Sequence, residues 1–138
     1  MLITGTGGGQ GRAERCASLR FAEAGAIVVG ADIETPGHAA AMAMVEAEGE
    51  VMTGSEALDR TVADDVRAWV QQAVTEHARI DVVHNKAGVV TMGGIATLNL
   101  EDWTWPVDRE LNQVFSATRR HWATEYTPPL PRRTTGPP

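Results

Sequence analysis

Cysteine, lysine and tyrosine each occur once in this 138-residue chain, and basic residues are outnumbered by acidic ones. The single Cys16 excludes an internal disulfide and is compatible with a reducing compartment. Lysine and arginine number 12 against 18 aspartates and glutamates, which gives a formal net charge of −6. A surface that binds nucleic acid needs a basic face, so this balance argues against nucleic acid as a partner.

Long apolar runs and metal-ligand spacings are also missing. No stretch reaches the roughly 18 consecutive apolar residues that span a bilayer, so we expect no membrane partner and a cytoplasmic location. The four histidines (His38, His77, His84 and His121) have no metal-ligand spacing with one another or with Cys16, and we expect no metal site. A content of 43% hydrophobic residues suits one globular domain of this length.

Short apolar runs alternate with helical patterns along most of the chain. We predict strands at residues 1–4, 26–32, 51–55 and 80–84. Helices are predicted at residues 10–24, at 36–48 after Thr35 as N-cap, after Thr61 as N-cap, near residue 100, and at 108–124. Strands that alternate with helices in this way predict βαβ units and therefore a parallel α/β sheet with right-handed crossovers.

The glycine cluster that ends the first predicted strand indicates a phosphate site. Gly5, Gly9 and Gly11 have the spacing T-G-x-x-x-G-x-G, and a helical pattern follows directly. Glycine permits unusual φ angles and close backbone approach, and a helix that opens there directs its free N–H groups at an anion. We predict that a pyrophosphate lies over this turn, with Gly7 and Gln10 among its contacts.

Asp32 ends the second predicted strand, where an acidic side chain selects the type of dinucleotide. Its carboxylate is expected to accept hydrogen bonds from the two hydroxyls of the adenosine ribose and to repel a 2′-phosphate. The sequence therefore predicts NAD as cofactor, with NADP disfavoured. Ile33, the next residue, is expected to contact the same nucleotide.

Taken in order, these features resemble the short-chain dehydrogenases/reductases. The glycine turn and Asp32 are followed by Asp59 after the third strand, by Asn85-Lys-Ala-Gly88 after the fourth, and by Glu101-Asp-Trp103 before a long helix. The resemblance covers residues 1 to about 120. It implies a Rossmann-type doubly wound parallel sheet of strand order 3-2-1-4, incomplete and within residues 1–125, between two helical layers.

The resemblance also implies roles for the later residues. Asp59, with Arg60 beside it, would face the adenine, and Asn85, Ala87 and Gly88 would lie at the carboxyl end of the fourth strand beside the cofactor. The family transfers a hydride between nicotinamide and an alcohol or ketone, with a Tyr-x-x-x-Lys pair as its acid/base group.

That catalytic pair is absent from these 138 residues. The one tyrosine, Tyr126, is followed four positions later by Leu130, and the one lysine is Lys86 in the Asn-Lys-Ala-Gly turn. Glu110 occupies the position of the family's active-site asparagine, and we assign no catalytic residue. We expect an incomplete, catalytically inactive chain that retains the cofactor half-site, arising from a shifted reading frame or misplaced start and stop.

Residues 126–138 hold five of the seven prolines, and we expect this tail to be disordered. The leading interpretation is an NAD-dependent oxidoreductase of this family; the alternative is a non-catalytic NAD-binding or regulatory protein. A third interpretation takes residues 128–133 as a polyproline ligand.

We expect two exposed apolar surfaces. The first is an apolar strand edge at residues 80–84. The second is one face of the 108–124 helix, where we expect a second copy of the chain to pack against Leu111, Val114, Phe115 and Trp122.

Overall fold

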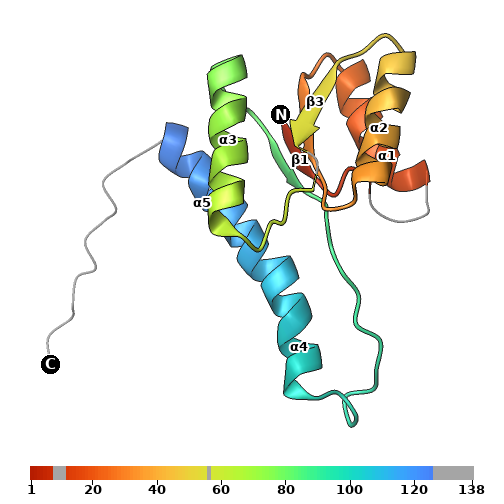
Figure 1. Ribbon diagram of the computed structural model, residues 1–138, viewed down its shortest axis with the longest axis vertical. Coiled ribbons are helices and arrows are strands. Elements are labelled where there is room, and N and C mark those ends of the chain that lie inside the picture. Colours follow the sequence, from red (N-terminus) through yellow and green to blue (C-terminus); the bar gives the residue numbers. More distant parts are fainter. Residues whose placement is uncertain (8–11, 56, 126–138) are drawn as a thin grey trace, which may run out of the picture.

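A computed structural model describes residues 1–7, 12–55 and 57–125 (Figure 1). Its strands are β1 (Leu2–Thr4), β2 (Val28–Ala31), β3 (Met52–Ser55) and β4 (Val83–Asn85). Its helices are α1 (Arg12–Glu23), α2 (Thr35–Ala47), α3 (Ala63–His77), α4 (Leu100–Val107), the π-helical η1 (Asp108–Asn112) and α5 (Gln113–Glu125).

The four strands form one parallel sheet in the order β3-β2-β1-β4. Thr4 at the end of β1 pairs with Ala31 of β2 on one side and with Asn85 of β4 on the other. The carboxyl ends of these three strands therefore meet at one edge, with β1 in the middle. The predicted α/β class and strand order are both confirmed.

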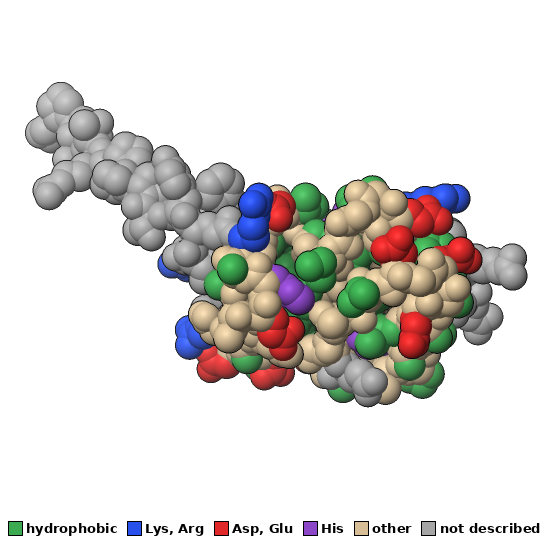
Figure 2. All heavy atoms as spheres, turned by 90° about the horizontal axis from the view of Figure 1, so that it is seen from above, with side chains coloured by type: hydrophobic (Ala, Val, Ile, Leu, Met, Phe, Trp, Pro, Cys, Tyr) green, Lys and Arg blue, Asp and Glu red, His purple; other side chains and the backbone are tan. Residues whose placement is uncertain are grey.

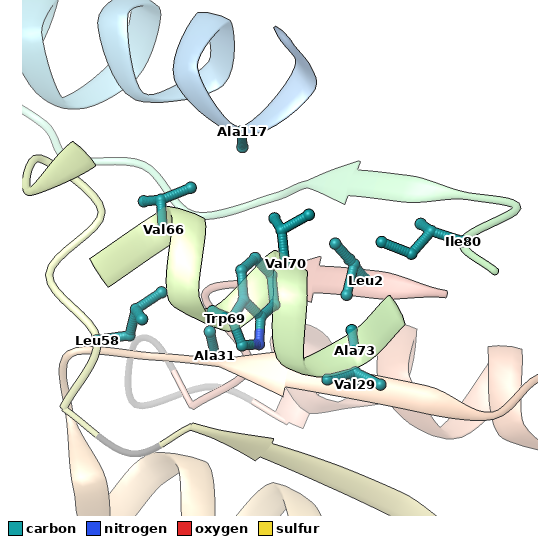
Figure 3. Close-up of a cluster of buried hydrophobic side chains, with 10 residues drawn as sticks. All are labelled: Leu2, Val29, Ala31, Leu58, Val66, Trp69, Val70, Ala73, Ile80 and Ala117. Carbon is teal, nitrogen blue, oxygen red and sulfur yellow. The ribbon is translucent and has the colours of Figure 1, made fainter. Parts of the chain in front are cut away.

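Helices cover both faces of the sheet, with α1 and α2 side by side on one face and α3 and α5 on the other (Figure 1). Successive strand residues point to opposite faces, so each strand contributes to two apolar clusters. The cluster below α3 and α5 contains Leu2, Val29, Ala31, Leu58, Val66, Trp69, Val70, Ala73, Ile80 and Ala117 (Figure 3). The cluster below α1 and α2 contains Ile3, Ala22, Val28, Ala41, Val45 and Met52.

Both predicted threonine N-caps are wrong. The N-cap of α2 is Glu34, and Thr35 is already helical, with Pro36 at the start of the helix. The N-cap of α3 is Val62, and neither cap makes a side-chain hydrogen bond to its helix. The Thr61 hydroxyl instead donates to the Asp59 carboxylate at 2.7 Å, and the helix begins after Val62.

The helices predicted near residue 100 and at 108–124 follow each other without a break as α4, η1 and α5. Asn99 caps α4 by accepting a hydrogen bond from the Asp102 N–H at 2.8 Å. Pro106 lies inside α4 and has no N–H for the helical ladder, and the wider π-helical turn begins two residues later.

The expected apolar edge at residues 80–84 is also smaller than predicted. β4 covers only Val83–Asn85, and Ile80 is buried in the cluster below α3 and α5, with 2% of its surface exposed. Val82 is the exposed apolar residue of this stretch. On the helix face, Leu111 and Phe115 are exposed as expected and Val114 is half-buried, while the side chain of Trp122 lies outside the described part of the structure.

On the face seen from above, acidic side chains are scattered among hydrophobic ones, and the few basic side chains stand apart from one another (Figure 2). No helix within residues 12–55 and 57–125 is long and apolar enough to cross a membrane.

Candidate functional site

The glycine turn leaves β1 at the edge where three strands end. Gly5 has a φ of +73°, and its N–H donates to the Ala31 carbonyl at 2.8 Å. A Cβ at Gly5 would lie 2.6 Å from the Cα of Ala87, which is shorter than any real contact. Only glycine therefore fits between the turn and the segment after β4. Gly9, Gln10 and Gly11 lie outside the described residues.

Asp32 stands directly beside this turn with 4% of its surface exposed. Its Oδ2 accepts a hydrogen bond from the Gly7 N–H at 2.7 Å, and its Oδ1 accepts one from the Glu34 N–H at 2.9 Å. The two backbone amides hold the carboxylate in one orientation. A carboxylate offers about four acceptor positions, so each oxygen can accept one more donor from a ligand.

Asp59 and Ile33 lie near each other in a small cavity of about 70 Å³, whose lining also includes Leu58 and Arg60. The Asp59 Oδ1 accepts hydrogen bonds from the Thr61 hydroxyl and from the Thr61 N–H, and these bonds lower the pKa of the Asp59 carboxyl below 3.8. Asp59 is therefore ionised at neutral pH.

The turn after β4 is bonded to the end of β1 through Lys86 and its neighbours. The Lys86 ammonium donates to the Gly5 carbonyl at 2.6 Å, and the N–H groups of Lys86 and Ala87 approach the Thr4 hydroxyl at 3.2 and 3.4 Å. The Asn85 Nδ2 donates to the Thr118 hydroxyl of α5 at 3.2 Å. Asn85, Ala87 and Gly5 are thus brought together at one edge, as predicted.

Glu110 and Gln113 contact the backbone of the same turn from the helix above it. The Val89 N–H donates to the Glu110 Oε1 at 2.7 Å, and a Cβ at Gly88 would lie 2.9 Å from that oxygen. The Gln113 Nε2 donates to the Ala87 carbonyl at 3.1 Å. Glu110 therefore bonds the turn rather than projecting alone into the site.

The sequence did not indicate that Gln113 contacts the site, nor that the Arg60 side chain points towards Gln113. The Arg60 guanidinium donates to the Gln113 Oε1 at 2.7 Å, and burial lowers its pKa while Asp32, Asp59 and Glu110 raise it. Arginine stays protonated under these influences. The one signal that could have identified Gln113 is its spacing of three residues from Glu110, which places both on one helix face.

A larger cavity of about 350 Å³ lies at the opposite, amino-terminal edge of the strands. Leu2, Phe21, Ile27, His77 and Val82 are among its lining residues, none of which belongs to the predicted site. Within the described residues no group of three or more histidine, cysteine, aspartate or glutamate side chains could hold a metal ion.

A parallel sheet of order β3-β2-β1-β4 between two helical layers defines a Rossmann-like α/β protein. The family model described as short chain dehydrogenase matches residues 1–125, and the chain belongs to this family. Members of the family bind nicotinamide dinucleotides, NAD(P)(H).

Similar proteins include one named as a ketoacyl reductase of the monensin polyketide synthase from Streptomyces virginiae. It is 38% identical over an alignment of 124 positions, which covers 86% of this chain and 44% of that protein. The 1-deoxy-11-beta-hydroxypentalenate dehydrogenase of Streptomyces arenae is 38% identical over 122 residues, or 88% of this chain and 39% of that protein. The chain thus spans less than half the length of these curated relatives.

Solved structures show the same fold. A short-chain dehydrogenase/reductase from Burkholderia xenovorans superposes with a TM-score of 0.82 at 27% identity, over 88% of this chain and 49% of that one. One from Mycobacterium marinum gives 0.80 at 25% identity, over 88% and 48%.

Proposed function

We propose that this chain binds NAD in preference to NADP, with the pyrophosphate over the glycine turn and the adenosine ribose at Asp32. The carboxylate of Asp32 carries this proposal. It is buried, and backbone amides hold both of its oxygens beside the turn. A ribose can donate its two hydroxyls to the remaining acceptor positions. A 2′-phosphate at the same place would meet a fixed negative charge that can turn away only by breaking two hydrogen bonds.

The remaining residues fit the rest of such a ligand. Gly5 and Gly7 keep the turn compact, because a Cβ at either position would collide with the backbone of Ala87 or of Gly37. We assign the pyrophosphate to this turn, together with Gly9, Gln10 and Gly11. We assign Ile33, Asp59 and Arg60 to the adenine side, where they line one cavity. We assign the nicotinamide side to Asn85, Ala87 and Gly88. These residues follow β4, which lies on the opposite side of β1 from β2 and Asp32.

Calorimetry with NAD and NADP tests the cofactor preference. We expect NAD to bind the chain more tightly than NADP does. Asp32→Asn removes the charge at nearly constant size, and we expect it to reduce the ratio of NAD affinity to NADP affinity by about tenfold. Asp65→Asn is the matched control, since Asp65 is an exposed aspartate on α3. Tighter binding of NADP by the unaltered chain contradicts the proposal.

We further propose that the protein is an oxidoreductase of the alcohol/ketone type, and that these 138 residues bind the cofactor without turning it over. A bound nicotinamide supplies the hydride carrier. The single lysine donates to the Gly5 carbonyl, which supports a structural rather than an acid/base use of its ammonium group. Oxidation of any of a panel of secondary alcohols with NAD by the purified chain contradicts the second part of this proposal.

A second candidate function is a non-catalytic NAD-binding or regulatory protein. It is supported by the combination of an ordered adenosine side and the lack of a Tyr-x-x-x-Lys pair among the 138 residues. Turnover with NAD and an alcohol excludes this candidate, whereas tight NAD binding with no turnover is the result expected of both candidates.

A further inference from the structure

Gln113 joins the turn that follows β4 to the segment that follows β3. Its side chain is buried, with 2% of the residue exposed. The Nε2 donates to the Ala87 carbonyl at 3.1 Å, while the Oε1 accepts from the Arg60 Nη1 at 2.7 Å. A buried amide bonded at both ends is held in one orientation, and one of its two bonds is charge-assisted.

The same helix face holds the turn at a second point. Glu110 precedes Gln113 by three positions, and its Oε1 accepts the Val89 N–H at 2.7 Å. The backbone is therefore bonded on both sides of Gly88, through the Ala87 carbonyl and the Val89 N–H. The bond from Arg60 to Gln113 adds a link from the segment after β3, which lies at the opposite end of the sheet from β4. Arg60 and Gln113 are 53 residues apart in the sequence.

The place of this turn relative to Asp32 decides which part of a dinucleotide it faces. β1 carries the glycine turn, β2 with Asp32 lies on one side of it, and β4 with Ala87 lies on the other. A dinucleotide in this fold lies across the point where the strand order reverses, with one nucleotide on each side. Given the proposed function, on which this step rests, the turn at Ala87–Val89 faces the nicotinamide half.

We propose that Arg60 and Gln113 are positioning residues that fix the Ala87–Val89 backbone for the nicotinamide half of the cofactor. Gln113 donates to the turn directly, and Arg60 acts through its hydrogen bond to Gln113. Arg60 also lies near the carboxylates of Asp32, Asp59 and Glu110, so its charge is balanced where it is partly buried. The two residues thus couple the segment after β3 to the segment after β4.

Binding of NADH and of AMP to Gln113→Met tests this proposal, because AMP probes the adenosine half alone. The variant keeps the length of the side chain and removes both of its hydrogen bonds. We expect the affinity for NADH to fall by about tenfold and the affinity for AMP to change by less than about twofold. Gln71→Met, at an exposed glutamine of α3, is the matched control and leaves both affinities unchanged.

Arg60→Met tests the same chain of bonds and serves if Gln113→Met folds poorly. Because Arg60 is also assigned to the adenine side, its readout is the binding of reduced nicotinamide mononucleotide, which carries the nicotinamide half alone. We expect the double variant to lose little more affinity for this mononucleotide than the Gln113→Met single variant, because both changes disrupt one network. Equal losses of NADH and AMP affinity in Gln113→Met, additive losses of mononucleotide affinity, or unchanged affinities for NADH and the mononucleotide overturn the inference while the proposed function stands. Failure of the unaltered chain to bind either nucleotide overturns the proposed function and this inference with it.

Discussion

Two features require glycine at position 5, its backbone conformation and its close packing, and each adds to the loss of stability expected when Gly5 is replaced. Its φ of +73° lies in the left-handed region, and Ala87 approaches the place that a Cβ would take to within 2.6 Å. Gly49, after α2, shares the first condition with a φ of +82° but has no atom within 4 Å of its Cβ position. The two glycines therefore separate backbone conformation from close packing.

We predict that Gly5→Ala lowers the free energy of unfolding by about 3 kcal/mol or more, since conformation and overpacking both contribute. Gly49→Ala should cost only about 1–2 kcal/mol, the conformational part alone. Denaturant unfolding of the two variants measures the difference. Equal losses would mean that the turn moves away from Ala87 without cost.

Asp59 provides a pH-dependent test of the segment after β3. Its pKa is lowered from 3.8 chiefly by the hydrogen bonds from Thr61. A carboxyl whose folded-state pKa is below its unfolded value stabilises the fold above the unfolded pKa, and this contribution is lost as the pH falls through the folded-state pKa.

We predict that Thr61→Val, which removes the hydroxyl donor, raises the pKa of Asp59 towards 3.8 and so reduces the loss of stability in acid below that pH. NMR titration of the Asp59 carboxyl measures the shift. Thr75→Val is the control, because the exposed Thr75 hydroxyl donates to a backbone carbonyl within α3. A pKa of Asp59 that stays unchanged in Thr61→Val contradicts the assignment of its cause.

At the scale of elements, the sequence predicts which elements form better than where they begin. The apolar run at residues 26–32 indicates a strand that is buried on both faces, and β2 forms there. The helical period after residue 62 indicates a helix that is buried on one face, and α3 forms there. Boundaries depend on single hydrogen bonds that have competitors. Thr61 is the predicted cap of α3, but its side chain is oriented towards the Asp59 carboxylate, to which its hydroxyl donates, and the cap is Val62.

The candidate site divides in the same way. Gly5, Gly7, Asp32 and the turn after β4 could be placed from the sequence, because parallel strands bring their carboxyl ends to one edge. The contact between Arg60 and Gln113 could not, since it joins residues on α5 and after β3 whose distance is set by helix packing. Local periodicity carries no information about which side chain of one helix meets which loop.

At the scale of the whole molecule, the helices that follow β4 leave large apolar side chains exposed to solvent. α4 projects beyond the sheet (Figure 1). Among residues 100–119, whose side chains the structure describes, five large apolar residues are exposed, namely Leu100, Trp103, Trp105, Leu111 and Phe115. Leu111 and Phe115 are 65% and 63% exposed and lie four positions apart, hence on one face. An apolar stripe of this kind is typical of a surface that another protein covers.

We predict that the chain self-associates through this stripe. Replacing both residues, Leu111→Lys and Phe115→Lys, should shift the protein towards monomer, because burying two ammonium groups in an apolar contact is unfavourable. Sedimentation velocity over a range of concentrations measures the change. Ile95→Lys, at a residue that is 89% exposed in the segment before α4, is the control and should leave association unchanged. If the unaltered chain is monomeric at all concentrations, or if Ile95→Lys has the same effect as the pair, then association does not run through the face of Leu111 and Phe115.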